Sequence, residues 1–417
     1  MPDRTIRHRS PARPAQAGFS LFEVLISLFV TSIVIVAALG LFDFNNRVTR
    51  VETQVAEMQQ SLRMGQLELV RMTRMAGRGG LPGSATLQPW PGGLALAVAN
   101  NVAANTHVGD DNSPLVVAGT DVITLRGVYS APIYQLNYSD PLSFQLTPPP
   151  PSELDTGFLT INSVSPTGVA QSLDTLAEAI RLQRREALIL VSPIDDAQYA
   201  IVELDPETSS VTVDSTQATI GFKVKDGSFT DEYAQLMPGA TFPSAVRTVA
   251  FVAILEEYRF FVWDDDRELD RFNQPVPRLA KARFFPGTQT LHPGDGDGSV
   301  VEMADYLTDL QVSLGIDLNN DGFVPYLGTD ADEWLFNSPD DDVNDPAWNT
   351  GGRLFNLRIT TVARTLNPDP GYTAAPVSRV EDRLYSEGAV PGTEDERQER
   401  MYRRRTTTTV VDMRNLS

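Results

Sequence analysis

Residues 24–42 contain no charged side chain, and this run most constrains the fold of the chain. At about 1.5 Å per residue, a helix of this length crosses a hydrocarbon core of about 30 Å. The run therefore predicts a membrane-spanning helix. One carboxylate, Glu23, stands directly before it. Because an ionised carboxylate in hydrocarbon costs about 3 kcal/mol or more, Glu23 is expected to need a partner charge.

A basic leader precedes the apolar run. Residues 1–18 carry Arg4, Arg7, Arg9 and Arg13 against a single acid, Asp3. An ordinary secretory signal has its apolar region before the cleavage site. Here the triplet Ala15-Gln16-Ala17, which looks like a signal-peptidase site, comes before the apolar run, so cleavage there would leave that run on the mature protein. Positive charge before a spanning helix predicts a cytoplasmic leader, with the rest of the chain exported.

The sequence Gly18-Phe19-Ser20-Leu21-Phe22-Glu23 resembles the class III signal of type IV pilins and type II secretion pseudopilins. The resemblance implies that a prepilin peptidase cuts after Gly18 and N-methylates Phe19. It also implies that Glu23 faces the N-terminal amine of a neighbouring subunit during assembly. That contact supplies a partner charge, which lowers the cost of burying the carboxylate. An ordinary signal anchor, with Glu23 at the level of the lipid headgroups, is the alternative.

Beyond Asp43 the apolar residues recur every three or four positions, which predicts an amphipathic helix continuing the first. They are Val48, Val51, Val55, Met58, Leu62, Gly65, Leu69, Met72 and Ala76. The helix over 19–76 would be on the order of 85 Å long and would end at the glycines of 77–80 and at Pro82. Its apolar stripe can pair with a second helix or pack against the chain's own head. Gly65 favours the head, because a glycine permits close approach of a strand.

The remaining chain is predicted to be mostly β. Short runs rich in Val, Ile, Thr and aromatic residues alternate with Gly, Pro, Asp and Ser. They cover 121–128, 158–164, 187–191, 198–204, 210–213, 220–224, 246–255, 258–262, 306–316 and 352–364, with a short helix over 174–186. We therefore expect an α+β, type IV pilin-like fold, in which a long N-terminal helix packs on a mostly antiparallel sheet. Its segments would be the leader 1–18, the transmembrane half-helix 19–46, the amphipathic half-helix 47–80 and a head 81–417 with room for an inserted subdomain.

Composition excludes several classes of function. The formal net charge is −20, and this argues against nucleic acid as a ligand of the head. The chain has no cysteine, so no disulfide stabilises an exported head. Its histidines are His8, His107 and His292, and it has no nucleophile elbow, phosphate-binding loop or His-Glu-x-x-His sequence. An enzyme is therefore not expected.

One acidic loop suggests a metal. Asp317, Asn319 and Asp321 supply oxygens at alternate positions before Gly322, as at the opening of a calcium loop, and the backbone carbonyl of Phe323 would follow. The twelfth position is Gly328 instead of Glu, so the loop is not a complete EF-hand. Further ligands to Ca²⁺ would come from Asp330, Asp332 or Glu333. The same residues also favour a solvated Asn-Asp-Gly turn without metal.

The C-terminal region adds a second resemblance. A strand ending in Gly315-Ile316-Asp317, an Asp-Gly loop, and a terminal strand with Arg403-Arg404-Arg405 and four threonines resemble PilW-like minor pilins. This implies a subunit of a complex that primes pilus assembly and lies at or near the pilus tip. Its partners would be the prepilin peptidase, other minor pilins, the major pilin, the inner-membrane assembly platform and, before assembly, membrane lipid.

Two alternatives remain open from the sequence. A GspJ-like minor pseudopilin of type II secretion has the same leader, although its head is shorter. A membrane-anchored surface binding module that never enters a filament would also have such a helix. In all three cases the head is expected on the far side of the inner membrane, in the periplasm, and in the first it reaches the pilus tip or cell surface.

Overall fold

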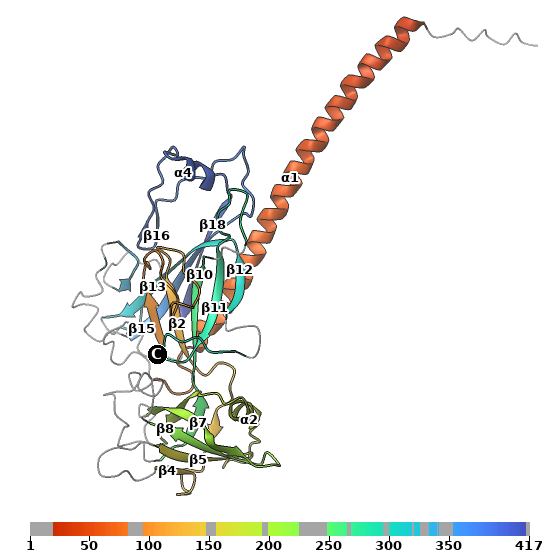
Figure 1. The fold of residues 1–417 in the computed structure, drawn as a ribbon. Helices are drawn as coiled ribbons and strands as arrows, with labels where there is room; N and C mark the ends of the chain where they lie inside the picture. Colours follow the sequence, from red (N-terminus) through yellow and green to blue (C-terminus); the bar gives the residue numbers. More distant parts are fainter. Residues whose placement is uncertain are drawn as a thin grey trace, which may run out of the picture. The chain divides into compact units, whose positions relative to one another are not determined.

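The computed structural model describes residues 20–81, 95–146, 156–193, 199–224, 248–264, 268–294, 300–318, 321–325, 333–339, 341 and 353–413. The chain forms two compact units, Met1–Gln54 and Val55–Ser417. Helix α1, Leu21–Met75, belongs to both (Figure 1). Antiparallel sheets make up most of the second unit, in agreement with the predicted fold class.

Helix α1 begins at a side-chain cap and ends at glycines. It stops one residue before the predicted Ala76, and Gly77, Gly79 and Gly80 follow with positive φ angles. Such angles strain residues that have a side chain, so the glycines turn the chain out of the helix. The amide of Gly77 donates to the carbonyl of Arg126 at 2.9 Å, which fixes the helix end to the head.

The amphipathic half of α1 is covered by the chain's own head. Its buried positions are Met58, Leu62, Gly65, Leu69, Met72 and Thr73. A Cβ placed on Gly65 would lie 2.8 Å from the Cβ of Ala304, so the strand there approaches the helix backbone closely, as predicted. Val48, which the sequence placed in the stripe, is 38% exposed, and that part of the prediction is wrong.

A five-stranded sheet has the order β1-β2-β10-β11-β12, with every pairing antiparallel. Its strands are β1 Leu96–Ala99, β2 Val122–Gly127, β10 Glu256–Trp263, β11 Arg278–Phe284 and β12 Val300–Asp305. Strand β10 follows β2 in space but not in sequence, with Gly127 opposite Glu256. The chain between these two strands therefore forms an insertion.

The insertion is a seven-stranded sheet in the order β3-β9-β6-β7-β8-β5-β4. Its elements are β3 Tyr134–Gln135, β4 Phe144–Leu146, β5 Thr156–Asn162, α2 Asp174–Arg181, β6 Ala187–Val191, β7 Tyr199–Val211, β8 Gln217–Lys223 and β9 Phe251–Ile254. The predicted runs 198–204 and 210–213 are one strand, β7, whose pairing with β8 shifts register between Asp205 and Ser210.

The C-terminal part forms a four-stranded sheet in the order β14-β13-β15-β18. Its strands are β13 Leu307–Asp317, β14 Trp334–Leu335, β15 Arg353–Arg364 and β18 Arg404–Asp412. The hairpin β16–β17, Arg379–Val380 and Arg383–Leu384, and the helix α4, Glu394–Glu399, lie between β15 and β18 in sequence. The glutamine of α1 next to Gly65, Gln66, donates to Thr361 Oγ1 at 3.0 Å, so α1 contacts this sheet too.

A buried cluster of ion pairs lies within the five-stranded sheet, between its strands β2 and β10. Glu257 on β10 is fully buried and accepts from Arg126 on β2 at 2.6 Å and from Arg259 at 2.9 Å. Burial alone would raise the pKa of Glu257, but the two guanidinium groups outweigh it and hold this pKa below its ordinary value. A buried carboxylate that stays ionised in this way needs both partners, because an unpaired charge in the core is costly.

Candidate functional site

The N-terminal end of α1 places the first candidate residue, Glu23. Its Oε2 accepts from the Ser20 amide at 3.0 Å, while the Ser20 hydroxyl accepts from the Glu23 amide at 3.2 Å. This reciprocal pair is a capping box, in which side chains satisfy the amides at a helix start. Glu23 is exposed within its unit. Gly18 and Phe19 lie outside the described residues, so the predicted cleavage site has no structural account.

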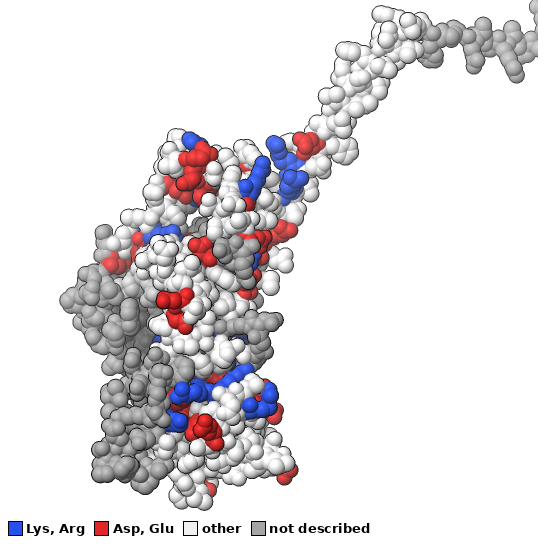
Figure 2. All heavy atoms as spheres, viewed as in Figure 1, with Lys and Arg blue, Asp and Glu red and all other residues white. Residues whose placement is uncertain are grey.

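The stretch that follows Glu23 has the properties of a membrane span. In the described part of the chain, α1 is the one helix long and apolar enough to cross a membrane, with a mean hydropathy of 2.7 in its most apolar window. None of that window is buried. Figure 2 shows this part of α1 without Lys, Arg, Asp or Glu, in contrast to the body. The N-terminal helix is therefore a membrane anchor candidate that exposes its apolar side chains all round.

The predicted calcium loop is only partly described. Asp317 is 3% exposed at the end of β13, where its Oδ1 accepts from the Asp321 amide at 3.1 Å and its Oδ2 from the Gly322 amide at 2.9 Å. The Phe323 amide donates to Asp321 Oδ1 at 2.8 Å, and the Phe323 ring is exposed. These bonds bring the backbone of Asp321 and Gly322 to the Asp317 carboxylate, and that of Phe323 to the Asp321 carboxylate.

The other proposed ligands do not complete a site in the described ranges. Glu333 is buried, and its carbonyl accepts from the Ile316 amide at 2.8 Å. Asn319, Asp330 and Asp332 lie outside the described residues. Among the residues that are described, no group of three or more His, Asp or Glu is arranged to hold a metal ion. Calcium binding thus remains a prediction.

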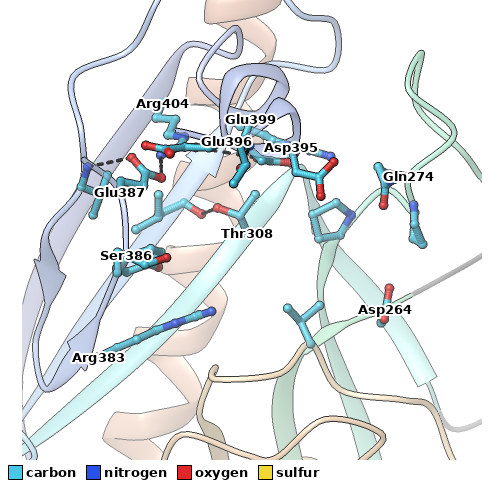
Figure 3. Close-up of a pocket in the computed structure, with 18 residues that line it drawn as sticks. Asp264, Gln274, Thr308, Arg383, Ser386, Glu387, Asp395, Glu396, Glu399 and Arg404 are labelled. Atoms are coloured by element: carbon cyan, nitrogen blue, oxygen red, sulfur yellow. Dashed lines mark hydrogen bonds and ion pairs between the residues drawn. The ribbon is translucent and has the colours of Figure 1, made fainter. Parts of the chain in front are cut away.

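A pocket that the sequence did not predict lies between the β10–β11 connection, β13, β15 and the segment around α4 (Figure 3). Its volume is about 550 Å³. Arginine–carboxylate pairs line it: Arg404 pairs with Glu387, and Arg364 Nη1 lies 2.8 Å from Glu399 Oε1. Arg364 lies on β15 and Arg404 on β18, whereas Glu387 and Glu399 belong to the segment 366–403. The pairs therefore hold this segment against the sheet.

The arginines of the terminal strand divide into paired and exposed side chains. Arg403 Nη2 lies 3.0 Å from Asp369 Oδ2, and Arg404 is paired in the pocket. Arg405 is exposed. The sequence offered these arginines as contacts for an acidic neighbour, and two of the three are engaged within the chain. Their partners are remote in sequence, so spacing alone could not identify the pairs.

A comparison with known families assigns the N-terminal segment. The family model of the prokaryotic N-terminal methylation motif matches residues 13–39, which include the leader end, Glu23 and most of the apolar run. The N-terminal segment therefore carries a prepilin-type methylation motif. The prediction of a class III prepilin signal is therefore confirmed, whereas the motif does not distinguish PilW-like proteins from other pilin-like chains.

Similarity beyond the N-terminal segment is weak. A solved structure with some similarity is the type IV-like pilin TTHA1219 from Thermus thermophilus, at 10% sequence identity. The similarity covers 59% of this chain and 94% of that one, with a TM-score of 0.18. No curated protein matches the chain. The resemblance to type IV pilins therefore rests on the methylation motif and on the apolar helix that contains most of it.

Proposed function

We propose that this chain is a minor pilin of a type IV pilus. A prepilin peptidase cleaves it after Gly18 and methylates Phe19, and the mature subunit joins other minor pilins in a complex that primes assembly at the tip. The observation that carries the proposal is the methylation motif over 13–39, which includes most of an exposed apolar run at the start of α1, together with a body that packs on the second half of the same helix. The role is structural and not catalytic.

The size of the body supports a minor rather than a major subunit. The body holds a five-stranded and a four-stranded sheet with a seven-stranded insertion. Shaft subunits repeat at close spacing, and such a body would crowd its neighbours there. Before assembly the helix spans the inner membrane with the body in the periplasm, where the major pilin and the assembly platform are its partners. After assembly the body lies at the pilus tip or the cell surface.

The mature N-terminus tests the proposal. The chain is expressed with and without a prepilin peptidase, and mass spectrometry of the intact protein determines its first residue. A start at methylated Phe19 that depends on the peptidase is expected. Presence of the processed chain in the sheared surface fraction of cells with a type IV pilus separates a pilin from a secretion pseudopilin. An uncut chain that still binds surfaces would favour a membrane-anchored binding module.

We also propose that Ca²⁺ binds at the turn around Asp317. Asp317 supplies a buried carboxylate at a strand end, and Gly322, with φ +78°, allows the turn that the loop needs. The backbone carbonyl of Phe323 and the side chain of Asp321 are adjacent candidate ligands. Hard oxygen ligands of this kind suit Ca²⁺.

A further inference from the structure

Strand β18 forms an open edge of the four-stranded sheet. It pairs with β15 from Arg404 opposite Arg364 to Asp412 opposite Asn356 without a register shift. In the described part of the chain, no strand pairs with its other side. An edge of this length presents a row of backbone donors and acceptors to which another strand can add.

The register determines which amides face outward. The Thr365 amide donates to the Arg403 carbonyl, and the Met413 amide donates to the Phe355 carbonyl, both at 3.0 Å. Because hydrogen-bonded residues alternate along an antiparallel pair, the residues between them at odd positions bond to β15. The N–H and C=O groups of Arg404, Thr406, Thr408, Val410 and Asp412 therefore point away from β15. Thr406, Thr408 and Asp412 are exposed.

The edge lacks the features that usually block strand addition. Proteins protect edges with charged residues, prolines or bulges. Residues 406–411 are Thr-Thr-Thr-Thr-Val-Val, without charge or proline, and their pairing is regular. Charges stand only at the two ends, with exposed Arg405 at the start and exposed Asp412 at the finish. A strand that adds here would carry an acidic residue near Arg405 and a basic residue near Asp412.

A symmetric pair of two β18 strands does not fit a membrane-anchored chain. Antiparallel pairing of identical edges relates the copies by a 180° rotation about an axis perpendicular to the sheet. Helix α1 lies against this sheet, because Gln66 Nε2 contacts Thr361 Oγ1 at 3.0 Å and the Thr407 carbonyl at 3.4 Å. The rotation would reverse the direction of α1 in the second copy. Two copies anchored in one membrane cannot pair in this way.

We propose that the free edge of β18 accepts an extended segment of a different subunit, which runs antiparallel to β18 and extends the four-stranded sheet. The proposal rests on the proposed function, because it requires a neighbouring subunit in the same assembly. The main-chain bonds at Thr406, Thr408 and Val410 give the contact its strength, and the charges at Arg405 and Asp412 set its register.

Amide hydrogen exchange at single-residue resolution tests the proposal directly. The mature full chain is measured purified in detergent, in native membranes and in the sheared surface fraction. Exchange at Thr406, Thr408 and Val410 is expected to slow by at least about tenfold in membranes or fibres, while Thr407 and Thr409 are protected in every sample. Rapid exchange at the three outward amides in all samples would overturn the proposal. An uncut chain absent from the sheared fraction would instead contradict the proposed function. The exchange rates of the three outward amides in the membrane sample would still show whether a strand adds to the β18 edge.

Proline substitutions at neighbouring positions give a second, independent test. Thr408→Pro removes an outward N–H and the hydroxyl that lies 2.9 Å from Thr360 Oγ1. Its melting temperature should therefore stay close to that of Thr408→Val, which lacks the same hydroxyl, while its incorporation into fibres or membrane complexes falls by about tenfold or more. Thr409→Pro removes a bond to β15 and should destabilise the chain itself. Thr408→Val, with its amide intact, is the matched control and should assemble normally. Normal assembly of a folded Thr408→Pro chain would refute strand addition.

Discussion

Replacing Gly65 by alanine tests how closely α1 packs on the head. In an exposed helix the change would stabilise by about 1 kcal/mol, because alanine is the better helix former. Here the new Cβ would lie 2.8 Å from Ala304 Cβ and 3.0 Å from Leu279 Cδ2. The leucine end can rotate away, but Ala304 Cβ is attached directly to the backbone of β12. Overpacking of this kind costs about 1–3 kcal/mol, so we expect a net loss of about 1–2 kcal/mol.

The assay is thermal unfolding of the mature chain in detergent, followed by near-ultraviolet circular dichroism. Gly65→Ala should lower the melting temperature by a few degrees. Gly40→Ala, the same change in the same helix, should not lower the melting temperature and can raise it, because nothing lies within 4 Å of its added Cβ. Ala304→Gly removes the obstructing atom, so the double variant should recover about 1 kcal/mol relative to the sum of the single changes. A Gly65→Ala chain more stable than the parent, with no coupling to position 304, would refute the packing argument.

Three further predictions concern charge. Glu257→Gln should destabilise the chain by about 3–5 kcal/mol at pH 7, because it removes the buried carboxylate charge that faces the guanidinium groups of Arg126 and Arg259. Since the pKa of Glu257 is lowered by folding, its stabilisation is full above the unfolded value near 4.5 and is lost as the pH falls through the folded pKa, so variant and parent should converge in melting temperature in acid. Glu23→Ala should leave cleavage after Gly18 intact, by mass spectrometry, and reduce incorporation into the surface fraction; equal incorporation would contradict an assembly role. If Ca²⁺ binds at Asp317, a chelator should lower the melting temperature of the parent chain and not that of Asp317→Asn. A melting temperature of the parent that the chelator does not change would contradict the proposed calcium site.

Sequence periodicity predicted those parts of the fold in which local pattern and burial agree. The spacing of Met58, Leu62 and Leu69 marks the face that α1 buries, and β6 lies where its run of five apolar residues indicated. Strand β10 begins two residues before the predicted run 258–262 and ends one residue after it. Its first residues, Glu256 and Glu257, are buried acids, and a charged pair at a strand start is usually taken as exposed. Their burial is compensated by hydrogen bonds from residues remote in sequence, such as that from the Tyr129 amide to Glu256 and that from Arg126 to Glu257.

The pocket and the open edge were beyond sequence reasoning for a related reason. Arg364 and Glu399 meet only because β15 and α4 are brought together by the fold, and nothing in their spacing indicates the pair. The threonine run of β18 indicated a strand, but not that the strand ends a sheet. By contrast, Gly18, Phe19 and Glu23 were recognisable from the sequence because they belong to a linear motif, the methylation motif over 13–39, which does not depend on the fold of the body.

The adjacency of Gly127 and Glu256 gives the body a modular construction. The seven-stranded insertion leaves β2 and returns at β10 through residues that lie opposite each other, so a short turn could join the two strands if the insertion were absent. Its removal would nevertheless not be neutral for the helix. Cβ atoms built on Gly79 and Gly80 would lie 2.4 Å from Val128 and 2.8 Å from Val191, so the chain leaving α1 rests on β6 of the insertion. A lineage could gain or lose this module by altering one hairpin, but only with a compensating change where the helix ends.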